Sequence, residues 1–367
     1  MKYYIVLCGL LLSILWGSTP ITGQNLSERD EVILKRLFYH YNALLNPECI
    51  KLPPGEFMER FSDLEKQVQV SMDSLTAPIS RGKAFLYNKQ GVLTSLGRYV
   101  TQKDVEGAAI LKEELEKRIS DLNIDSPDLD LLSDFEIRSL LEAYYNWKAP
   151  RTSMAERSTS VLYNIKSEKV RRAYALYNYK MMIQLSGSSF LSEALAWDFE
   201  LCSVDSVTLQ EVRTLSKKYK TITKGQVAYD FEMEDEKGNL HRLSDFRGKY
   251  VFMDVWNTLC HVCVEDLPLF IRTGVRYRDK DVVFLTLSLD LGPIGWKKLL
   301  DQKNISRSIP HYRSTQRTEF INNYCIYGMP RYILVDPEGK IVDAWNRSPK
   351  TPYFESDFER KIGIRNE

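Results

Sequence analysis

Two patterns of hydrophobic and polar positions divide the chain. From Ser27 to about Lys220, apolar residues recur at spacings of three and four, which is the period of an amphipathic helix. From about Tyr219 onward the pattern changes to short β-branched and aromatic runs bounded by turn residues, which are typical of strands. The sequence therefore predicts a helical N-terminal part and a C-terminal part that contains a sheet.

Capping signals locate several of the N-terminal helices. Ser133 and Glu136 form a capping box ahead of an apolar stripe, and Pro150 follows the resulting helix. Ser167 opens another helix, which Gly187 is placed to end. Apolar stripes predict two further helices, around residues 57–72 and 111–122.

Strands and helices alternate in the C-terminal part. Helices between strands imply crossover connections, and hence a central mixed sheet with helices on both faces. A turn at Asp336–Gly339 joins the last two strands as a hairpin. The predicted strands are Phe231–Met233, Tyr250–Trp256, Val282–Ser288, Arg331–Val335 and Lys340–Trp345, and the predicted helices are Val264–Arg278, Ile294–Lys303 and Arg317–Tyr324.

Together these patterns predict an α+β chain. At ~100 to 200 residues per domain, a length of 367 residues suggests two domains. We place the linker at Lys220–Gln226, because the period of the pattern changes there. This gives an all-α domain over residues 24–220 and an α/β domain over residues 221–367.

Residues 1–23 have the pattern of a secretory signal peptide. Lys2 supplies a positive charge, Ile5–Trp16 is an apolar run, and a stretch with small residues, Gly17–Gly23, follows. A retained membrane anchor is the alternative, but the run reaches only about 18 Å against the ~30 Å hydrocarbon core of a bilayer. We expect cleavage near Gly23 and a mature protein without a stable membrane span, outside the cytoplasm and most simply in the periplasm.

Composition and charge exclude several classes of protein. Apolar residues make up 44% and charged residues 27%, as in soluble globular proteins and unlike fibrous or disordered ones. Lys and Arg number 50 against 49 Asp and Glu, so no overall field attracts nucleic acid, and we expect no nucleic-acid partner.

The cysteines are informative in an oxidising compartment. Of the six, Cys8 falls in the signal peptide, which leaves an odd number, so at least one thiol is unpaired or shared. Pairing of Cys49 with Cys202 stays open, because sequence does not give their separation. Cys325 is expected to be a buried thiol that packs as a small hydrophobic residue.

The motif Cys260-His261-Val262-Cys263 carries the sharpest chemical signal. It lies between the predicted strand Tyr250–Trp256 and a helix. The first sulfur therefore lies at a helix N-terminus, where unpaired N–H groups and the helix dipole favour a thiolate. The second cysteine can then attack a mixed disulfide that the first has formed.

Zinc, haem and a structural disulfide are the alternatives for this motif. A zinc site needs a second pair of ligands, and the chain has no second C-x-x-C. Haem attachment needs a histidine directly after the second cysteine, where this chain has Val264. A disulfide that closes so small a loop adds little chain-entropy stabilisation. We therefore favour redox chemistry with no metal and no organic cofactor.

Short motifs follow one another in the C-terminal part. They are Gly225, Ala228, Asp230 and Phe231, then Leu243-Ser244-Asp245-Phe246-Arg247-Gly248-Lys249, then Asp254 to Cys263 with Trp256, then Pro268, then Gly328-Met329-Pro330, Tyr332–Asp336 and Gly339. In order and spacing, residues 225–363 resemble the TlpA/ResA-like branch of the thioredoxin superfamily. The chain differs from the family at Tyr229, Leu259 and Arg331, where proline, tryptophan and threonine are usual.

The resemblance implies a thioredoxin-like fold and a thiol-disulfide oxidoreductase. Cys260 would be the nucleophile and Cys263 the resolving thiol. A cis peptide bond before Pro330 would bring Met329 beside Cys260 and offer its backbone to an extended substrate strand. Arg331 would border the same groove and favour substrates with an acidic group near the target cysteine.

Two carboxylates, a histidine and a tryptophan complete the site that the resemblance implies. Asp254 would lie on the strand beneath the dithiol and help to deprotonate the second cysteine, and Asp266 would have a related role on the helix. An inert Asp254 and a surface Asp266 are the alternatives. His261 either favours the Cys260 thiolate as an imidazolium or faces solvent. Trp256 occupies the aromatic position of the family.

The predicted function is extracytoplasmic reduction of protein disulfides, with protein thiol or disulfide substrates and a membrane electron donor that the resemblance implies. A partner-binding protein with a thioredoxin-like scaffold is one alternative, but a scaffold has no need of an intact C-x-x-C. A thiol peroxidase is another, but Asn257 stands where that site has a threonine.

Overall fold

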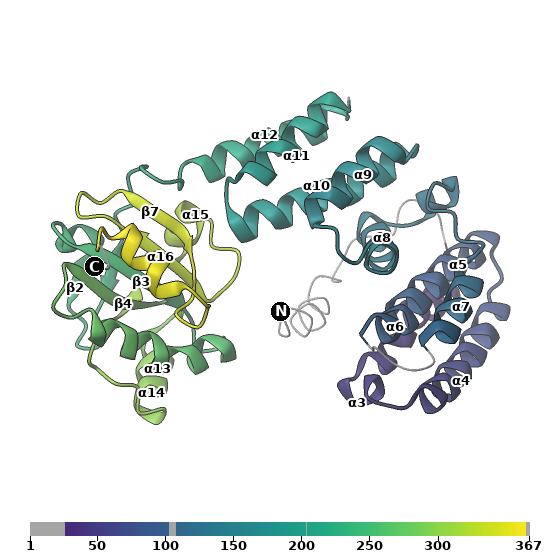
Figure 1. The fold of residues 1–367 in the computed structure, drawn as a ribbon, viewed down its shortest axis with the longest axis horizontal. Coiled ribbons are helices and arrows are strands. Elements are labelled where there is room, and N and C mark those ends of the chain that lie inside the picture. Colours follow the sequence, from purple (N-terminus) through teal and green to yellow (C-terminus); the bar gives the residue numbers. More distant parts are fainter. Residues whose placement is uncertain (1–25, 103–107, 203, 365–367) are drawn as a thin grey trace. The chain divides into compact units, whose positions relative to one another are not determined.

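The computed structural model describes residues 26–102, 108–202 and 204–364. The predicted signal peptide, residues 1–23 with Cys8, lies outside the described residues. Across the three described ranges, no helix combines the length and the apolar character needed to cross a membrane. The chain divides between Tyr177 and Asn178 into two compact units (Figure 1).

The first unit is helical, as its pattern predicts. The capping box is present, because Ser133 Oγ accepts from the Glu136 N–H and Glu136 Oε2 accepts from the Ser133 N–H, at 3.4 and 2.6 Å. The helices are α2 (Glu28–Tyr39), η1 (His40–Leu45), α3 (Pro47–Ile50), α4 (Pro54–Asp73), α5 (Pro78–Val92), η2 (Leu93–Gly97), α6 (Arg98–Gln102), α7 (Ala108–Ile119), η3 (Pro127–Leu131), α8 (Asp134–Lys148), α9 (Met154–Asn164) and the first part of α10 (Glu168–Ser186).

Apolar stripes on these helices form one core. Phe57 and Phe61 of α4 are fully buried, and so are Leu115 of α7 and Ile137 of α8. Residues three and four apart lie on the same face of a helix, so each stripe buries as a unit and the charged side chains stay outside.

The second unit contains a mixed sheet of seven strands in the order β2-β1-β5-β4-β3-β6-β7. The central strand β3 pairs parallel with β4 and antiparallel with β6. The strands are β1 (Glu232–Glu234), β2 (Leu240–Arg242), β3 (Tyr250–Trp256), β4 (Val282–Ser288), β5 (His311–Ser314), β6 (Arg331–Val335) and β7 (Ile341–Asn346). The helices are the rest of α10, α11 (Phe190–Leu201), α12 (Ser206–Lys220), η4 (Leu243–Phe246), α13 (His261–Arg276), α14 (Pro293–Gln302), α15 (Arg317–Asn323) and α16 (Phe354–Lys361).

Helices cover both faces of this sheet (Figure 1). On one face, Phe252 and Trp256 of β3 pack in a single apolar cluster with residues of α13, α14 and α16. Outside that cluster, Phe320 and Tyr324, from α15 and the residue after it, contact Phe231. The predicted α+β class, with a mixed sheet in the C-terminal part, is confirmed.

The predicted strands β3, β4 and β6 have the bounds that the sequence indicates. Two strands were missed, β2 with the sequence LHR and β5 with the sequence HYRS. Both are short and rich in polar residues, so they lack the apolar alternation that marks a strand.

The division of the chain differs from the predicted linker at Lys220–Gln226. The linker pairs with the edge strand β7, because Gly225 N donates to Ile341 O at 2.7 Å and Ile341 N donates to Gln226 O at 2.8 Å. The ring of Tyr219, on α12, stacks on Trp345 of β7. The helices α11 and α12 therefore belong to the same compact unit as the sheet.

Candidate active site

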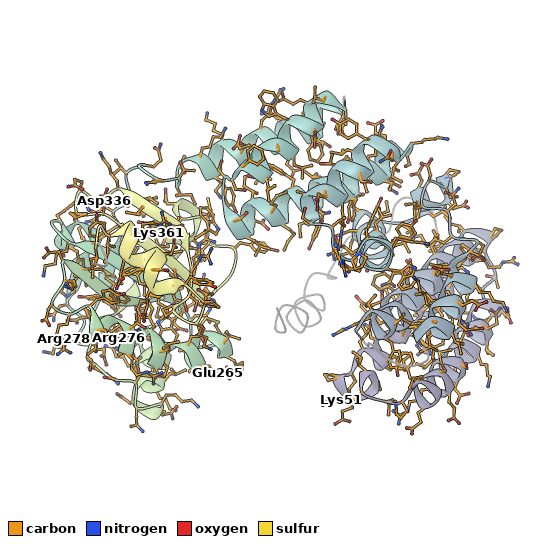
Figure 2. All side chains as sticks on the ribbon, in the orientation of Figure 1. Lys51, Glu265, Arg276, Arg278, Asp336 and Lys361 are labelled. Carbon is orange, nitrogen blue, oxygen red and sulfur yellow. A yellow bond between two sulfur atoms is a disulfide. The ribbon has the colours of Figure 1, made fainter. Side chains whose placement is uncertain are left out.

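Cys260 and Cys263 form a disulfide where β3 ends and α13 begins. Cys260 is the N-cap of α13, and its Sγ accepts from the Cys263 N–H at 3.3 Å. Figure 2 labels Glu265, in the N-terminal part of α13, and Arg276, the last residue of this helix. The N-cap position is where helix N–H groups lack partners within the helix, so it favours negative charge on the first sulfur.

The two sulfurs differ in access to solvent. Cys263 is fully buried in the cluster between the sheet and α13, whereas Cys260 lies partly exposed at its edge. Leu259, directly before it, is 85% exposed. A protein that approaches this site can therefore reach the sulfur of Cys260 and not that of Cys263.

The turn ahead of Cys260 is held by Asp290, a residue that the sequence analysis missed. Thr258 Oγ1 donates to Asp290 Oδ1 at 2.6 Å, and Ser288 Oγ donates to Asp290 Oδ2 at 2.6 Å. Asp290 lies shortly after β4, whose carboxyl end meets that of β3 in a parallel pair. In sheets of this kind, functional residues gather at the carboxyl ends of parallel strands. The position of Asp290 just after a predicted strand could therefore have pointed to it. Asn257 Oδ1 accepts from the Leu259 N–H at 3.1 Å and so shapes the same turn.

The Met329–Pro330 peptide bond is cis, as predicted. Pro330 leads into β6, which is the antiparallel neighbour of β3. Met329 is partly buried against the same apolar cluster as Cys260. The disulfide and the cis-proline segment thus adjoin one patch of the core.

The prediction that the Arg331 side chain borders a substrate groove is wrong. Its guanidinium is buried over the ring of Trp345, with 3.9 Å from Cζ to the ring centroid. Its Nε donates to Ala344 O at 2.6 Å, and its Nη1 donates to Gln184 O at 3.5 Å. Burial lowers the pKa of Arg331 to about 10, so the group stays charged at neutral pH. Its counter-charge includes the carbonyl end of α10, where a helix dipole favours a cation.

Asp254 lies fully buried on β3, and within the described part of the chain neither of its carboxylate oxygens has a hydrogen-bond partner. Burial, and then the negative charge of Asp266, hold its pKa well above the usual range. In the sheet register Asp254 stands opposite Tyr332 of β6. Burial, followed by the charge of Asp254, raises the pKa of the Tyr332 hydroxyl.

Asp266 faces inward and not toward the surface. It follows Cys263 by one helical turn, is 5% exposed, and forms an ion pair with Lys350. Lys350 lies between β7 and α16, far from Asp266 in the sequence, so nothing in the sequence pattern pointed to it.

Replacing Asp254 with asparagine is expected to stabilise the oxidised protein at high pH. The folded-state pKa exceeds the unfolded value of ~3.9, so folding binds a proton and wild-type stability falls as pH rises between the two values. The loss is about 1.4 kcal/mol for each pH unit within that window. In urea denaturation, the free energy of unfolding of Asp254→Asn should therefore exceed that of the wild type by more at pH 8 than at pH 5.

Asp279→Asn, at an exposed position, is the matched control for this prediction. It removes the same charge at the surface and should leave the pH dependence of stability as in the wild type. An equal advantage of Asp254→Asn at both pH values would mean that the buried carboxyl does not titrate in this window.

The other residues singled out in the sequence differ in their exposure to solvent. Trp256 is fully buried in the cluster that holds Cys263, and His261 is exposed as the first residue of α13. Cys49 and Cys325 are buried thiols outside any disulfide, so Cys49 is not paired with Cys202 here. Among the described residues, no group of three or more His, Cys, Asp or Glu side chains could hold a metal ion.

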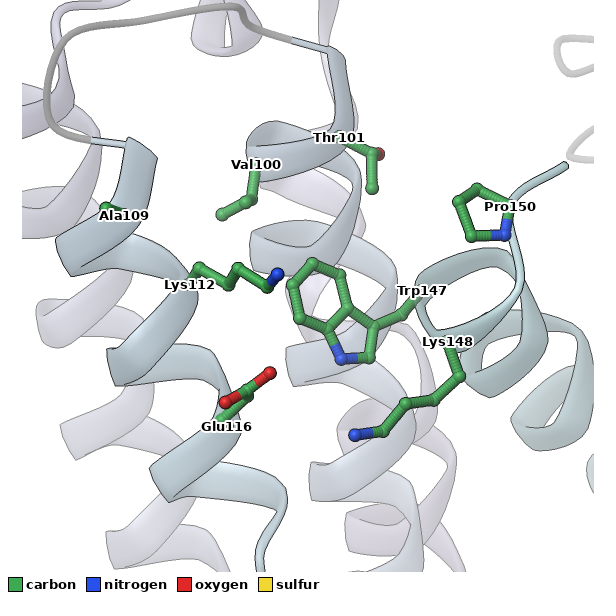
Figure 3. A pocket seen from close by; sticks show the side chains of 8 residues that line it. All are labelled: Val100, Thr101, Ala109, Lys112, Glu116, Trp147, Lys148 and Pro150. Carbon is green, nitrogen blue, oxygen red and sulfur yellow. The ribbon is translucent and has the colours of Figure 1, made fainter.

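The helical unit has a cavity of its own, of about 480 Å³ (Figure 3). Trp147 lies in its wall, and the Lys112 ammonium lies 5.8 Å from the centroid of the Trp147 ring. Lys148 and Glu116 supply further charges of both signs. Among the described residues that line this cavity there is no cysteine.

Known proteins are similar to the C-terminal part of the chain. The AhpC/TSA family matches residues 224–344. A "Thiol-disulfide oxidoreductase ResA" of Bacillus cereus is 27% identical over 143 residues, covering 39% of this chain and 80% of the relative. ResA of Geobacillus kaustophilus is 30% identical over 117 residues, covering 32% of this chain and 66% of the relative.

Solved structures are also similar in sequence to this part of the chain. The thioredoxin domain of a thiol-disulfide oxidoreductase from Bacteroides vulgatus is 31% identical, covering 38% of this chain and 98% of that one, with a TM-score of 0.34. The cysteine pair, the sheet order and the sequence matches agree. The C-terminal part of this chain is therefore a thioredoxin-like domain that matches the AhpC/TSA family, and it is a thiol-disulfide oxidoreductase similar to ResA.

Proposed function

We propose that this chain reduces disulfides of other proteins outside the cytoplasm, with Cys260 as the nucleophile and Cys263 as the resolving thiol. The observation that carries the proposal is the difference between the two sulfurs, one partly exposed at a helix N-terminus and one fully buried. An exposed thiolate can attack a protein disulfide, and a buried neighbour can complete the exchange without meeting solvent.

The reaction transfers two electrons from the dithiol to the substrate. The Cys260 thiolate attacks one sulfur of the substrate disulfide, forms a mixed disulfide and releases the first substrate thiolate, which takes a proton from water. Cys263 then loses its proton, attacks the Cys260 sulfur and releases the second substrate thiolate. The products are the Cys260–Cys263 disulfide and two substrate thiols.

Asp254 is the proposed acceptor of the Cys263 proton. A thiolate at a fully buried position is costly unless a nearby group takes its proton. In this proposal Asp254 would lie beneath the dithiol. It stands on β3, neither of its carboxylate oxygens has a hydrogen-bond partner among the described residues, and burial raises its pKa. Buried negative charge there also disfavours a dithiolate, which makes the pair more reducing. His261 would act the other way, but solvent screens an exposed residue.

The cis-proline segment is the proposed site for the substrate backbone. Met329 can offer its N–H and C=O to an extended strand beside Cys260. Because Arg331 is buried, we propose no preference for acidic substrates. A membrane electron donor would return the disulfide to the dithiol after each cycle, in the compartment to which the sequence of residues 1–23 would direct the chain.

The reduction potential tests the direction of electron flow. Equilibration of the full chain with glutathione buffers should give a potential nearer the ~−270 mV of thioredoxin than the ~−120 mV of a strong oxidant. A potential above about −150 mV would overturn the assignment as a reductase.

Two assays separate the alternatives. Dithiothreitol alone reduces insulin disulfides slowly. A scaffold would leave the rate of that reaction unchanged, whereas the proposed reductase increases it. A thiol peroxidase would consume hydrogen peroxide at the expense of the dithiol. We expect no such activity, since Asn257 is used to shape the turn.

A further inference from the structure

The helix α11 has apolar residues on two opposite faces. On the inner face, Leu195 and Phe199 are buried, and the ring centroids of Phe199 and Tyr179 of α10 lie 6.2 Å apart. On the outer face, Phe190 is 85% exposed and Trp197 is 71% exposed. An ordinary surface helix buries one apolar face and turns a polar face to solvent. A second apolar face on the same helix therefore indicates a partner.

The exposed residues have the spacing at which one helix packs along another. Phe190, Ala194, Trp197 and Leu201 follow one another at intervals of four, three and four, and all are exposed. Such a repeat of 3.5 residues keeps one narrow stripe facing a partner helix, as at the core positions of a coiled coil. At 1.5 Å per residue the stripe is about 17 Å long, nearly the whole of α11. We call these four residues the α11 seam.

The two glutamates beside the seam are already paired within the chain. Glu193 forms an ion pair with Lys220 at 3.0 Å, and Glu200 forms one with Arg213 at 3.0 Å. Both cations belong to α12, which contacts α11 (Figure 1). The seam itself carries no charge. It therefore fits a partner face that is equally apolar, rather than one of opposite charge.

The area of this surface suits an interface between two copies of the chain. Aromatic side chains bury about 150–250 Å² each, so Phe190 and Trp197 alone expose roughly 300 Å², as much as the largest apolar patch of many monomers. Leu191, Leu201 and Val207, in the first turn of α12, are also exposed and bring the surface toward the ~800 Å² that each partner of a standard interface buries. In a two-fold dimer the same patch meets itself, and an uncharged patch does so without opposing like charges.

We propose that this chain forms a two-fold symmetric dimer in which the α11 seam packs antiparallel against the α11 seam of a second copy. In this register Trp197 lies over the partner subunit's Ala194, whose small side chain leaves room for the indole. Phe190 lies over the partner subunit's Leu201. The antiparallel arrangement also sets opposite helix dipoles side by side. The proposal does not depend on the thiol chemistry of the chain.

Sedimentation velocity of the full chain, over a range of concentrations, measures the oligomeric state. The wild type should be a dimer. Trp197→Lys places two ammonium groups in the apolar interface and should raise the dissociation constant by about 100-fold or more. The matched control is Leu291→Lys, which makes a similar change at an exposed apolar position outside α11 and should leave the dimer intact.

A second variant, Ala194→Glu, tests the register of the two helices. Glutamate is a good helix former, so this change at an exposed position should preserve the fold, which circular dichroism checks. Alone, Ala194→Glu should also weaken the dimer. Mixed with Trp197→Lys chains it should form dimers again, because the introduced carboxylate then faces the introduced ammonium and one wild-type contact between Trp197 and Ala194 remains.

A wild-type chain that is monomeric at every concentration would overturn the proposal, whether its seam is then free or covered by another part of the same chain. So would a dimer that Leu291→Lys dissociates and Trp197→Lys does not. Failure of the mixed variants to form dimers would overturn the antiparallel register.

Discussion

Replacing Cys260 with serine should lower the rate of protein-disulfide reduction by roughly 10³-fold or more, to the rate of the reductant alone. A serine hydroxyl is not ionised at neutral pH and forms no mixed disulfide, so the first step has no nucleophile. Cys263 does not replace it, because its sulfur is fully buried. Insulin turbidity in dithiothreitol measures the rate, and circular dichroism checks that the fold persists.

Variants of the other cysteines test the specificity of this effect. Cys49→Ser and Cys325→Ser remove buried thiols outside the disulfide and should retain turnover. Cys263→Ser should accept the first attack but not resolve it, so a covalent adduct with the substrate should accumulate and dissolve in excess dithiothreitol. Substantial turnover by Cys260→Ser would show that the roles of the two cysteines are not those proposed.

Replacing Gly187 with alanine should destabilise the second unit by about 2–4 kcal/mol. Gly187 has a φ of +70°, and a Cβ there would lie 2.5 Å from Cζ3 of Trp345. The indole has little room to move, since its Nε1 donates to Gln184 O at 3.2 Å and Arg331 lies over its ring. For a unit of this size, each kcal/mol lowers the melting temperature by roughly 2–4 °C.

Gly225→Ala is the matched control, because Gly225 has a φ of +85° and nothing within 4 Å of the added Cβ. It should show the backbone strain alone, about 1–2 kcal/mol. The difference between the two variants isolates the clash with Trp345. Equal losses of unfolding free energy in the two variants would mean that a Cβ at position 187 does not clash with Trp345.

The sequence determined those elements whose signals are local. The strand β3 has the predicted bounds, and the capping box of Ser133 and Glu136 is formed. Both depend on the period of apolar residues, or on side chains three residues apart, which the chain fixes without distant contacts. The position of Cys260 and Cys263 after a buried strand and ahead of a helix is local in the same sense. Sequence alone therefore located the disulfide.

Arg331 shows where local reasoning ended. The sequence correctly predicted that Arg331 begins the strand after Pro330. It did not predict that the Arg331 side chain extends to Trp345 and to Gln184 on α10. The helix end and the edge strand that bury it lie far apart in sequence from one another. The same contacts moved the boundary between the compact units from the predicted linker to Tyr177 and Asn178.

The buried acid pair shows the same limit. The order of motifs placed Asp254 and Asp266 near the dithiol, but their burial and the approach of Lys350 appear only in the folded chain. The charge of a carboxyl depends on the solvent that it loses and on the charges a few ångströms away. Those distances are set by how β3, α13 and the loop before α16 pack together. The sequence therefore identified the two carboxyl groups, but only the tertiary structure determined that Asp266 forms an ion pair with Lys350.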